Sequence, residues 1–239
     1  MISPYYSRNG LVIYKGDCRD ILPQLPAESI GLTLTSPPYN CGLKYSGYED
    51  DLPNEAFREL NRAWLAEVFR CSKETARLYA VVSDKMLWWM RPLGEEAGWT
   101  WGQLLVWCKP NFSGGTTRVS GDWNMMTEWV LLYRKGKRVP MLASGETTHN
   151  YVVIPSPQTN WKKERKEHIA QWPSKLPLHL LARTPGDVVL DPFMGSGATL
   201  LAAGELGRQA IGIEVSEADC ALAVTRLDRF IDENKEGAA

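Results

Sequence analysis

The amino-acid sequence predicts an α/β domain built around a mostly parallel sheet of seven strands. Short apolar segments alternate along the chain with longer segments whose apolar residues recur at helical spacing. With 44% hydrophobic and 23% charged residues among 239, the composition excludes a collagen, a coiled coil and a membrane protein. A chain of this length buries a sizeable core, so we expect a single domain over residues 1–239.

The individual elements follow from hydrophobic periodicity. The expected strands cover residues 11–14, 30–35, 77–83, 103–109, 128–133, 188–190 and 210–213. The expected helices cover residues 54–71, 85–97, 173–182, 197–206 and 217–232. In the first helix, helical spacing predicts a buried face made of Phe57, Leu60, Trp64 and Val68. Two long polar stretches, 109–126 and 134–171, interrupt the alternation, and such loops are usually functional or disordered.

Cysteine usage indicates a reducing compartment. The five cysteines form no C-x-x-C pair and no Cys/His cluster, so we expect neither a disulfide framework nor a metal site. The first residues contain no apolar signal-peptide core, and no apolar run approaches the roughly 18 residues that span a bilayer. We therefore expect a cytoplasmic protein with no membrane partner.

The sharpest motif is Ser36-Pro37-Pro38-Tyr39, which directly follows the expected strand 30–35. One interpretation is a proline-rich turn. The functional interpretation is that the two prolines fix φ and remove two N–H donors, which leaves the carbonyl of Pro37 as an outward-facing acceptor. Ser36 adds a hydroxyl oxygen beside it, and Tyr39 supplies a flat ring for stacking. Two acceptors next to an aromatic ring suit an exocyclic amino group on a planar base.

Such an amino nitrogen is a poor nucleophile because its lone pair is delocalised into the ring. Hydrogen-bond acceptors that hold its protons return electron density to the nitrogen, so no activated Cys or Ser nucleophile is needed. A base in a duplex is paired and stacked, and it must be flipped out at a cost of roughly a few kcal/mol. Stacking on Tyr39, worth about 1–3 kcal/mol, would offset that cost.

The second motif is a glycine turn between a strand and a helix, Asp191-Pro192-Phe193-Met194-Gly195-Ser196-Gly197-Ala198-Thr199. A turn of this kind lets a ligand approach the backbone and points helix N–H groups at it. A plain tight turn and a dinucleotide site are the alternatives, but Leu200 stands where a dinucleotide fingerprint needs a third glycine. Glu214, at the end of the next strand, is placed to hold the hydroxyls of a ribose. The pattern indicates an adenosine-containing cofactor.

A third motif, Gly16-Asp17-Cys18, follows the first expected strand. From the residues alone, a helix N-cap is the favoured interpretation of the Asp17 carboxylate.

Together, these motifs resemble the amino-group DNA methyltransferases, which methylate cytosine N4 or adenine N6 with S-adenosylmethionine. The acceptor motif precedes the glycine turn, and this order is similar to the permuted β-type arrangement. The resemblance covers most of the chain. It implies a Rossmann-like class I methyltransferase fold, S-adenosylmethionine as cofactor and double-stranded DNA as partner, with a homodimer and a cognate restriction endonuclease left open.

The resemblance also implies roles for residues. Catalysis falls to Ser36, Pro37, Pro38 and Tyr39. Cofactor binding falls to Asp17, Cys18, His168, Lys175, Asp191, Pro192, Phe193, Gly195, Ser196, Gly197, Thr199 and Glu214. The chain departs from the family pattern at Ile169, where proline is usual, and at Thr127, where histidine is usual before Glu128.

The resemblance extends to the target base and to the DNA. Serine at position 36 is similar to the cytosine-N4 subgroup, whereas Asp-Pro-Pro-Tyr is the commoner adenine-N6 form, so cytosine is favoured and adenine is the alternative. Target recognition falls to an insertion at about residues 134–167, with residues 110–126 as a second candidate. The expected phosphate contacts are Arg118, Arg134, Lys135, Lys137, Arg138, Lys162, Lys163, Arg165 and Lys166.

The charge distribution agrees with this assignment. The chain has 27 basic and 28 acidic side chains, a net charge of -1, yet residues 109–183 carry 12 basic and 5 acidic side chains, or +7. A solvated basic face is the alternative interpretation of that surplus. Other functions also stay open: methylation of RNA or of a protein amide, for which Asn-Pro-Pro-Tyr is more typical, and a non-catalytic DNA-binding module. A nicotinamide dehydrogenase is disfavoured by the missing third glycine.

Overall fold

The computed structural model describes residues 2–43, 47–110, 126–142, 148–157 and 172–236, without the side chains of residues 235 and 236. The described residues form one sheet of nine strands in the order β1-β2-β9-β8-β3-β4-β6-β5-β7. The strands are β1 (Tyr6–Arg8), β2 (Leu11–Lys15), β3 (Ile30–Thr35), β4 (Ser72–Val82), β5 (Thr100–Cys108), β6 (Thr127–Arg134), β7 (Tyr151–Val153), β8 (Val188–Asp191) and β9 (Gln209–Glu214).

The sheet is parallel through its centre and antiparallel at two places. The neighbours β2, β9, β8, β3 and β4 all run parallel to one another. β6 lies antiparallel between β4 and β5, and β1 forms an antiparallel hairpin with β2. The chain proceeds from β3 to β4 on one side and from β8 to β9 on the other, so the strand order reverses between β3 and β8. In open α/β sheets, ligands bind at the carboxyl ends of strands at such a switch point.

All seven expected strands are present, but the described residues contain nine strands, two more than expected. β4 begins at Ser72 rather than at residue 77. The additional strands, β1 and β7, have three residues each and pair with β2 and β5. A three-residue segment is too short to display a period of two in the sequence, and pairing with a neighbour defines it instead.

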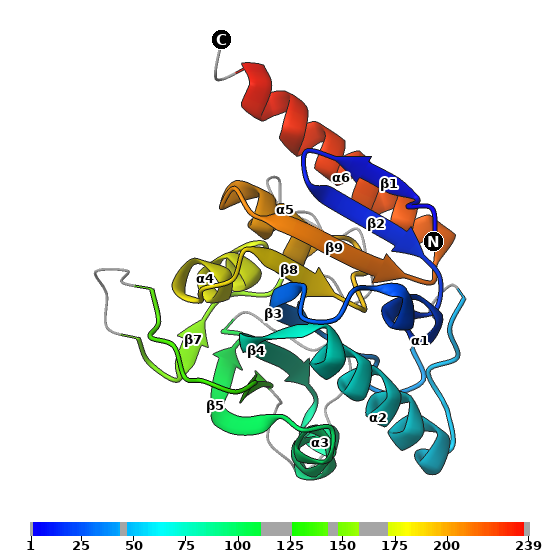
Figure 1. The fold of residues 1–239 in the computed structure, drawn as a ribbon, viewed down its shortest axis with the longest axis vertical. Coiled ribbons are helices and arrows are strands. Elements are labelled where there is room, and N and C mark those ends of the chain that lie inside the picture. The colour runs from blue at the N-terminus through cyan, green and yellow to red at the C-terminus, as the bar shows by residue number, and fades with distance from the viewer. Residues whose placement is uncertain (1, 44–46, 111–125, 143–147, 158–171, 237–239) are drawn as a thin grey trace.

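The five expected helices are confirmed with small shifts at their ends. They are α2 (Asn54–Cys71), α3 (Asp84–Glu96), α4 (Lys175–Arg183), α5 (Ala198–Glu205) and α6 (Glu217–Glu236). The short helix α1 (Cys18–Ile21) and the 3-10 turn η1 (Leu22–Gln24) were not expected. Figure 1 shows the arrowheads of β2, β8 and β9 pointing to the side where α1 lies.

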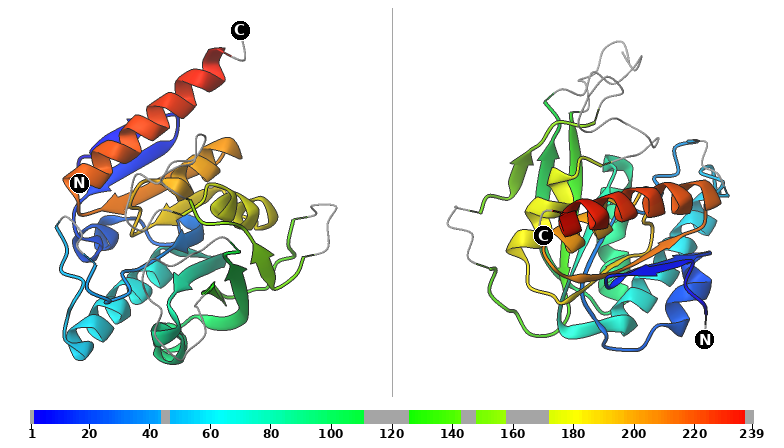
Figure 2. Two further views of the ribbon diagram at one scale, coloured as in Figure 1. Left: turned by 180° about the vertical axis from the view of Figure 1, so that it is seen from behind. Right: turned by 90° about the horizontal axis from the view of Figure 1, so that it is seen from above.

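Helices cover both faces of the sheet. Alternate residues of β4 belong to different cores: Tyr79 and Val81 pack with residues of α4, α5 and α6, whereas Leu78 and Ala80 pack with residues of α1, α2 and α3. The predicted apolar face of α2 is buried, with Trp64 fully enclosed. Figure 2 shows α6 alongside the β1–β2 hairpin. Within the described ranges, no helix combines the length and the apolar character that a membrane span requires.

Candidate active site

A cavity of about 430 Å³ opens at the carboxyl ends of the central parallel strands. Its walls include residues at or within two positions after the ends of four neighbouring strands: Asp17 after β2, Ser36 after β3, Asp191 at the end of β8 and Glu214 at the end of β9. These strands are parallel, so their carboxyl ends meet at one edge of the sheet, and three motifs far apart in the sequence line one cavity.

The acceptor motif lies in this cavity as a unit. Ser36, Pro37, Pro38 and Tyr39 all line it, with Pro37 buried and the other three half-buried. The Ser36 hydroxyl donates to the Tyr39 hydroxyl oxygen over 3.3 Å and lies 3.4 Å from the carbonyl oxygen of Val81. The Tyr39 hydroxyl in turn donates to Glu128 Oε2 over 2.9 Å. The phenol is therefore tethered at its tip, which fixes the position of its hydroxyl group in the cavity wall.

A buried carboxylate organises the loop after Tyr39. Asp50, only 3% exposed, accepts hydrogen bonds from the backbone N–H groups of Asn40, Cys41 and Leu43 at 2.9, 3.1 and 3.0 Å. Asn40 adopts a φ of 54°, which reverses the chain, and its side chain exchanges two hydrogen bonds with the backbone of Leu52. The loop carries Leu43, Gly47 and Tyr48 to the cavity wall.

The glycine turn forms the opposite wall. Gly195 and Gly197 have positive φ values of 51° and 81°, a region that favours glycine. Gly197 is the N-cap of helix α5, and a Cβ added to it would lie 3.1 Å from the Cβ of Ala223. The Glu214 carboxylate accepts the Gly195 N–H at 2.9 Å and the Ser216 N–H at 2.8 Å. The residues of the turn that line the cavity are Asp191, Pro192, Phe193, Met194, Gly195, Ser196, Ala198 and Thr199.

Asp191 links the two motifs. It is 3% exposed, and its Oδ1 accepts the Thr35 hydroxyl at 2.7 Å and the Phe193 N–H at 3.2 Å. Burial raises the pKa of Asp191 to about 6, while the hydrogen bond from Thr35 acts in the opposite direction. Thr35 immediately precedes Ser36, so this bond sets the acceptor motif and the glycine turn at a fixed separation. Phe193 packs edge-on against Trp64 of α2, with ring centroids 5.7 Å apart.

Asp17 is an N-cap, as the residues indicated, and it also lines the cavity. Its carboxylate accepts the Arg19 N–H at 2.8 Å and forms an ion pair with the Arg19 guanidinium at 2.6 Å. The hydrogen bonds from the Arg19 side chain lower the pKa of Asp17. Cys18 lies beside it in the wall, and burial raises the pKa of this thiol to about 12, which keeps it protonated.

Two expected cofactor contacts within the described residues, Lys175 and Gly197, do not line the cavity. Lys175 is exposed at the start of α4 and is not one of the described residues around the cavity. His168 lies outside the described residues. The helix that follows it begins at Lys175 rather than at residue 173, and Trp172, just before it, does line the cavity.

Sequence reasoning missed the pair Lys109 and Glu128. Their side chains line the cavity and form an ion pair, with Lys109 Nζ 2.7 Å from Glu128 Oε1, and they are only 8% and 19% exposed. Both residues fall in segments that the sequence predicts only as strands, 103–109 and 128–133. The pairing of Cys108 with Thr127 across β5 and β6 brings the two side chains together, and a residue pattern within one strand does not reveal it.

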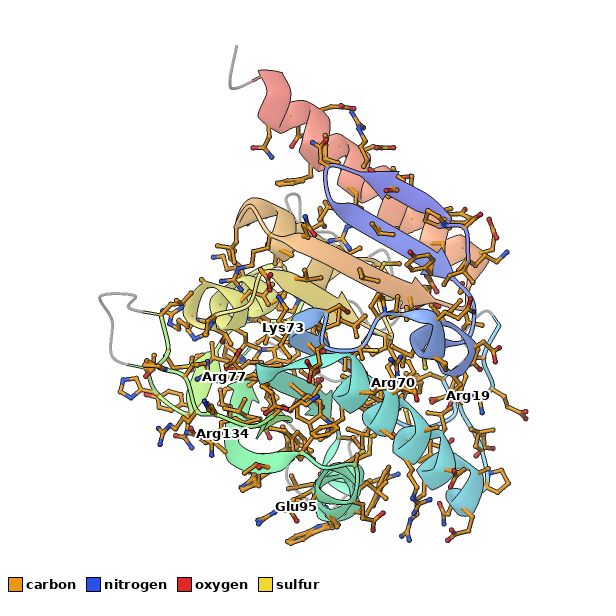
Figure 3. All side chains as sticks on the ribbon, in the orientation of Figure 1. Arg19, Arg70, Lys73, Arg77, Glu95 and Arg134 are labelled. Carbon is orange, nitrogen blue, oxygen red and sulfur yellow. The ribbon has the colours of Figure 1, made fainter. Side chains whose placement is uncertain are left out.

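The basic segment after β6 divides into buried and exposed parts. Lys135 is wrongly predicted to contact phosphate: it is 7% exposed, and its ammonium donates to the carbonyls of Phe69 and Ser72 at 3.0 and 2.8 Å, near the end of α2. Arg134 is half-buried and pairs in register with Arg77 of β4; both are labelled in Figure 3. Lys137 and Arg138 are exposed. The other expected contacts, Arg118, Lys162, Lys163, Arg165 and Lys166, lie outside the described residues.

The cavity fits an adenosine-containing methyl donor. Its walls offer the Glu214 carboxylate, which can accept hydrogen bonds from ribose hydroxyls, and a glycine turn that allows close approach of a ligand. They also include the ring of Phe193. These features lie in the same cavity as Ser36 and Tyr39, so a donor held by them would face the acceptor motif.

Comparison with known proteins also indicates a methyltransferase. Residues 30–225 match the N6/N4 methyltransferase family, described as DNA methylase. The chain is 28% identical to the type II methyltransferase M.ScaI of Streptomyces caespitosus, over 94% of this chain and 84% of that protein. Its fold is similar to that of the M1.HpyAVI–SAM complex, with a TM-score of 0.73, 22% identity, and 91% and 98% of the two chains covered. The cytosine-N4-specific PvuII DNA methyltransferase gives a TM-score of 0.78 at 21% identity, over 96% and 93%.

Proposed function

From the premise that this chain belongs to the DNA methylase family of N6 and N4 methyltransferases and uses S-adenosylmethionine, we propose that it methylates cytosine N4 of a base flipped out of double-stranded DNA. The observation that carries the proposal is that Ser36 and Tyr39 share one cavity with the glycine turn and Glu214. Adenine N6 is the alternative target, because it presents the same amino geometry.

The residues of the acceptor motif act on the target amino group. The flipped base stacks on Tyr39, whose ring is held by Glu128. The two amino hydrogens are accepted by the Pro37 carbonyl and the Ser36 hydroxyl oxygen, which restores electron density to the nitrogen. Serine rather than aspartate at position 36 supports cytosine, since this form resembles the N4 subgroup.

The opposite wall holds the donor. S-adenosylmethionine supplies an electrophilic methyl group when it is bound. Glu214 would hold the ribose hydroxyls, Asp17 the adenine, and the turn around Gly195 the rest of the molecule, since all of them line the cavity. The two walls meet at Asp191, which bonds to Thr35 of the one and Phe193 of the other, so donor and acceptor are positioned by the same buried carboxyl group.

We assign target recognition to the insertion at 134–167, where Lys137 and Arg138 are exposed and available for phosphates. The positive charge of residues 109–183 supports this assignment, because counterion release from DNA requires basic groups on the protein.

The test is to incubate the protein with tritiated S-adenosylmethionine and unmethylated duplex DNA, and then to digest the DNA and identify the labelled nucleoside by mass spectrometry. We expect N4-methylcytosine. N6-methyladenine would establish the alternative, and label on neither base would overturn the proposal. Ser36→Ala should abolish most of the label, whereas Ser29→Ala, just before the start of β3, should not change it.

A non-catalytic DNA-binding module is the competing function from another class. It is disfavoured because the acceptor motif, most of the glycine turn and Glu214 line one cavity. Calorimetry with S-adenosylmethionine separates the two functions, because a module of that kind would show no binding.

A further inference from the structure

We infer that Glu128, held by Lys109, is a positioning residue that sets the direction of a hydrogen-bond chain through Tyr39 to Ser36, so that the Ser36 oxygen can only accept from the target amino group. This inference rests on the proposed function and adds to it the residues that orient the acceptor.

The chain of contacts is continuous. Lys109 Nζ lies 2.7 Å from Glu128 Oε1, Tyr39 donates to Glu128 Oε2 over 2.9 Å, and Ser36 donates to the Tyr39 oxygen over 3.3 Å. All four side chains line the same cavity. They come from the loop after β3 and from the facing ends of β5 and β6, where the Lys109 N–H also donates to the Met126 carbonyl at 2.7 Å. The pair is therefore fixed to the sheet through the backbone.

The chemistry of the two ends gives the chain a single direction. An ammonium group only donates hydrogen bonds, and an ionised carboxylate only accepts them. Because Glu128 accepts from both Lys109 and Tyr39, the Tyr39 hydroxyl must donate its one proton to the carboxylate. The Tyr39 oxygen is then an acceptor for Ser36. The second contact of the Ser36 hydroxyl, the Val81 carbonyl at 3.4 Å, is also only an acceptor. In either case the proton of Ser36 points into the protein, and its lone pairs are left for the substrate.

A serine acceptor needs such a device and an aspartate does not. A hydroxyl both donates and accepts, so an unconstrained serine could donate to the base instead of accepting from its amino group. An aspartate at the same position would accept in every orientation. The partial burial of Glu128 strengthens its hold on Tyr39, and Lys109 supplies the opposite charge that a carboxylate in such a place requires.

The geometry also argues against a purely structural ion pair. Glu128 uses one oxygen for each partner, and the partner on the second oxygen is the tip of a ring in the acceptor motif. The Lys109 ammonium lies over the Trp107 ring, 5.5 Å from its centroid, and Trp107 is itself held by the carbonyl of Ile154 at 2.7 Å. Contacts with the sheet thus hold the ion pair in place, and the pair in turn orients Tyr39.

The experiment compares Glu128→Gln, Tyr39→Phe and the double variant in single-turnover transfer of tritiated methyl groups to unmethylated plasmid DNA. A glutamine amide can donate to Tyr39 and so removes the fixed direction, while the phenylalanine ring still stacks but ends the chain. Rates are expressed per S-adenosylmethionine-binding site, measured by calorimetry, so a misfolded fraction does not count. Glu55→Gln, an exposed glutamate at the start of α2, is the matched control.

We expect each single variant to lower the single-turnover rate about 10- to 100-fold with cofactor affinity within about twofold of the original, and the double variant to be no slower than the slower single variant. An independent structural role of Glu128 predicts instead that the two losses multiply. Multiplied losses, or a Glu128→Gln rate equal to that of the unaltered protein, would overturn the inference. Absence of DNA labelling by the unaltered protein would contradict the proposed function itself, so the two failures are distinguishable.

Discussion

The carboxylate of Glu214 accepts the backbone N–H of Gly195 at 2.9 Å, which joins the end of β9 to the glycine turn after β8. The same carboxylate accepts the Ser216 N–H at 2.8 Å through its other oxygen. The residue that we assign to the ribose therefore also shapes the turn beside it. A ligand bound there meets a carboxylate whose orientation is already fixed.

Glu214→Ala should weaken S-adenosylmethionine binding by about 10- to 100-fold. The substitution removes the proposed ribose contact and leaves two backbone N–H groups without their acceptor, and losses of this type are typically about 1–3 kcal/mol. Calorimetric titration with the cofactor measures the effect. Glu205→Ala, an exposed glutamate at the end of α5, is the control, and an unchanged affinity of the Glu214 variant would contradict the assignment.

Asp191 should make the stability of the protein depend on pH. Its pKa is raised by burial from an ordinary 3.8 to about 6, so its stabilising contribution is complete only well below 3.8, where the group is protonated in both states, and is lost as the pH rises from there through about 6. The loss is about 3 kcal/mol. Asp191→Asn is neutral at every pH, so the Tm of the unaltered protein should fall relative to this variant between pH 4 and pH 7. Differential scanning fluorimetry without cofactor measures this, and a pH-independent difference would count against it.

The fold and the positions of the three motifs could be predicted because they depend on local patterns. The apolar strands that precede Ser36 and Asp191 are short and continuous, and both motifs come directly after them. Parallel strands place such ends at one edge, so proximity of the motifs follows from the strand alternation alone. The segment at β7 has only three residues within a polar stretch, and the sequence carries no periodic signal for it.

The residues that sequence reasoning missed depend on contacts between distant elements. Tyr39 and Glu128 are 89 residues apart, and their bond requires both the strand order β3-β4-β6 and the register of β6. Lys135 belongs to a basic cluster that is typical of a solvated face. It is buried because β6 continues as far as Arg134 beside β4, which brings the next residue over the end of α2. Neither fact is encoded by the residue types near Lys135.

Lys135→Ala should reduce stability rather than DNA affinity. It removes two hydrogen bonds from an ammonium group to the carbonyls of Phe69 and Ser72, and its contact with the Phe69 ring, 4.5 Å from the ring centroid. We expect a loss of about 2 kcal/mol, or about 4–8 °C in Tm. The matched comparison is Lys137→Ala, an exposed lysine two residues away, which should leave the Tm unchanged.

The Lys137→Ala and Arg138→Ala variants should weaken DNA binding at every sequence and reduce its dependence on salt. Each is expected to lower the slope of log affinity against log salt concentration by about 1, because one phosphate contact releases about one counterion. Fluorescence anisotropy with labelled duplex DNA at several salt concentrations measures the slope. If neither slope changes, these two exposed residues do not face the DNA, and the basic segment is a solvated face.

Asp50→Ala should loosen the loop that follows Tyr39 without unfolding the domain. The carboxylate accepts three backbone N–H groups in a buried position, and its loss leaves them unsatisfied, which favours local opening over global unfolding. We expect amide exchange at residues 40–43 to accelerate about 10- to 100-fold and the affinity for S-adenosylmethionine to fall about 10-fold, because Leu43 and Tyr48 of this loop line the cavity. Hydrogen-exchange mass spectrometry and calorimetry measure the two effects. Glu49→Ala alters the exposed neighbour and should change neither, while unchanged exchange in the Asp50 variant would show that the loop is held by other contacts.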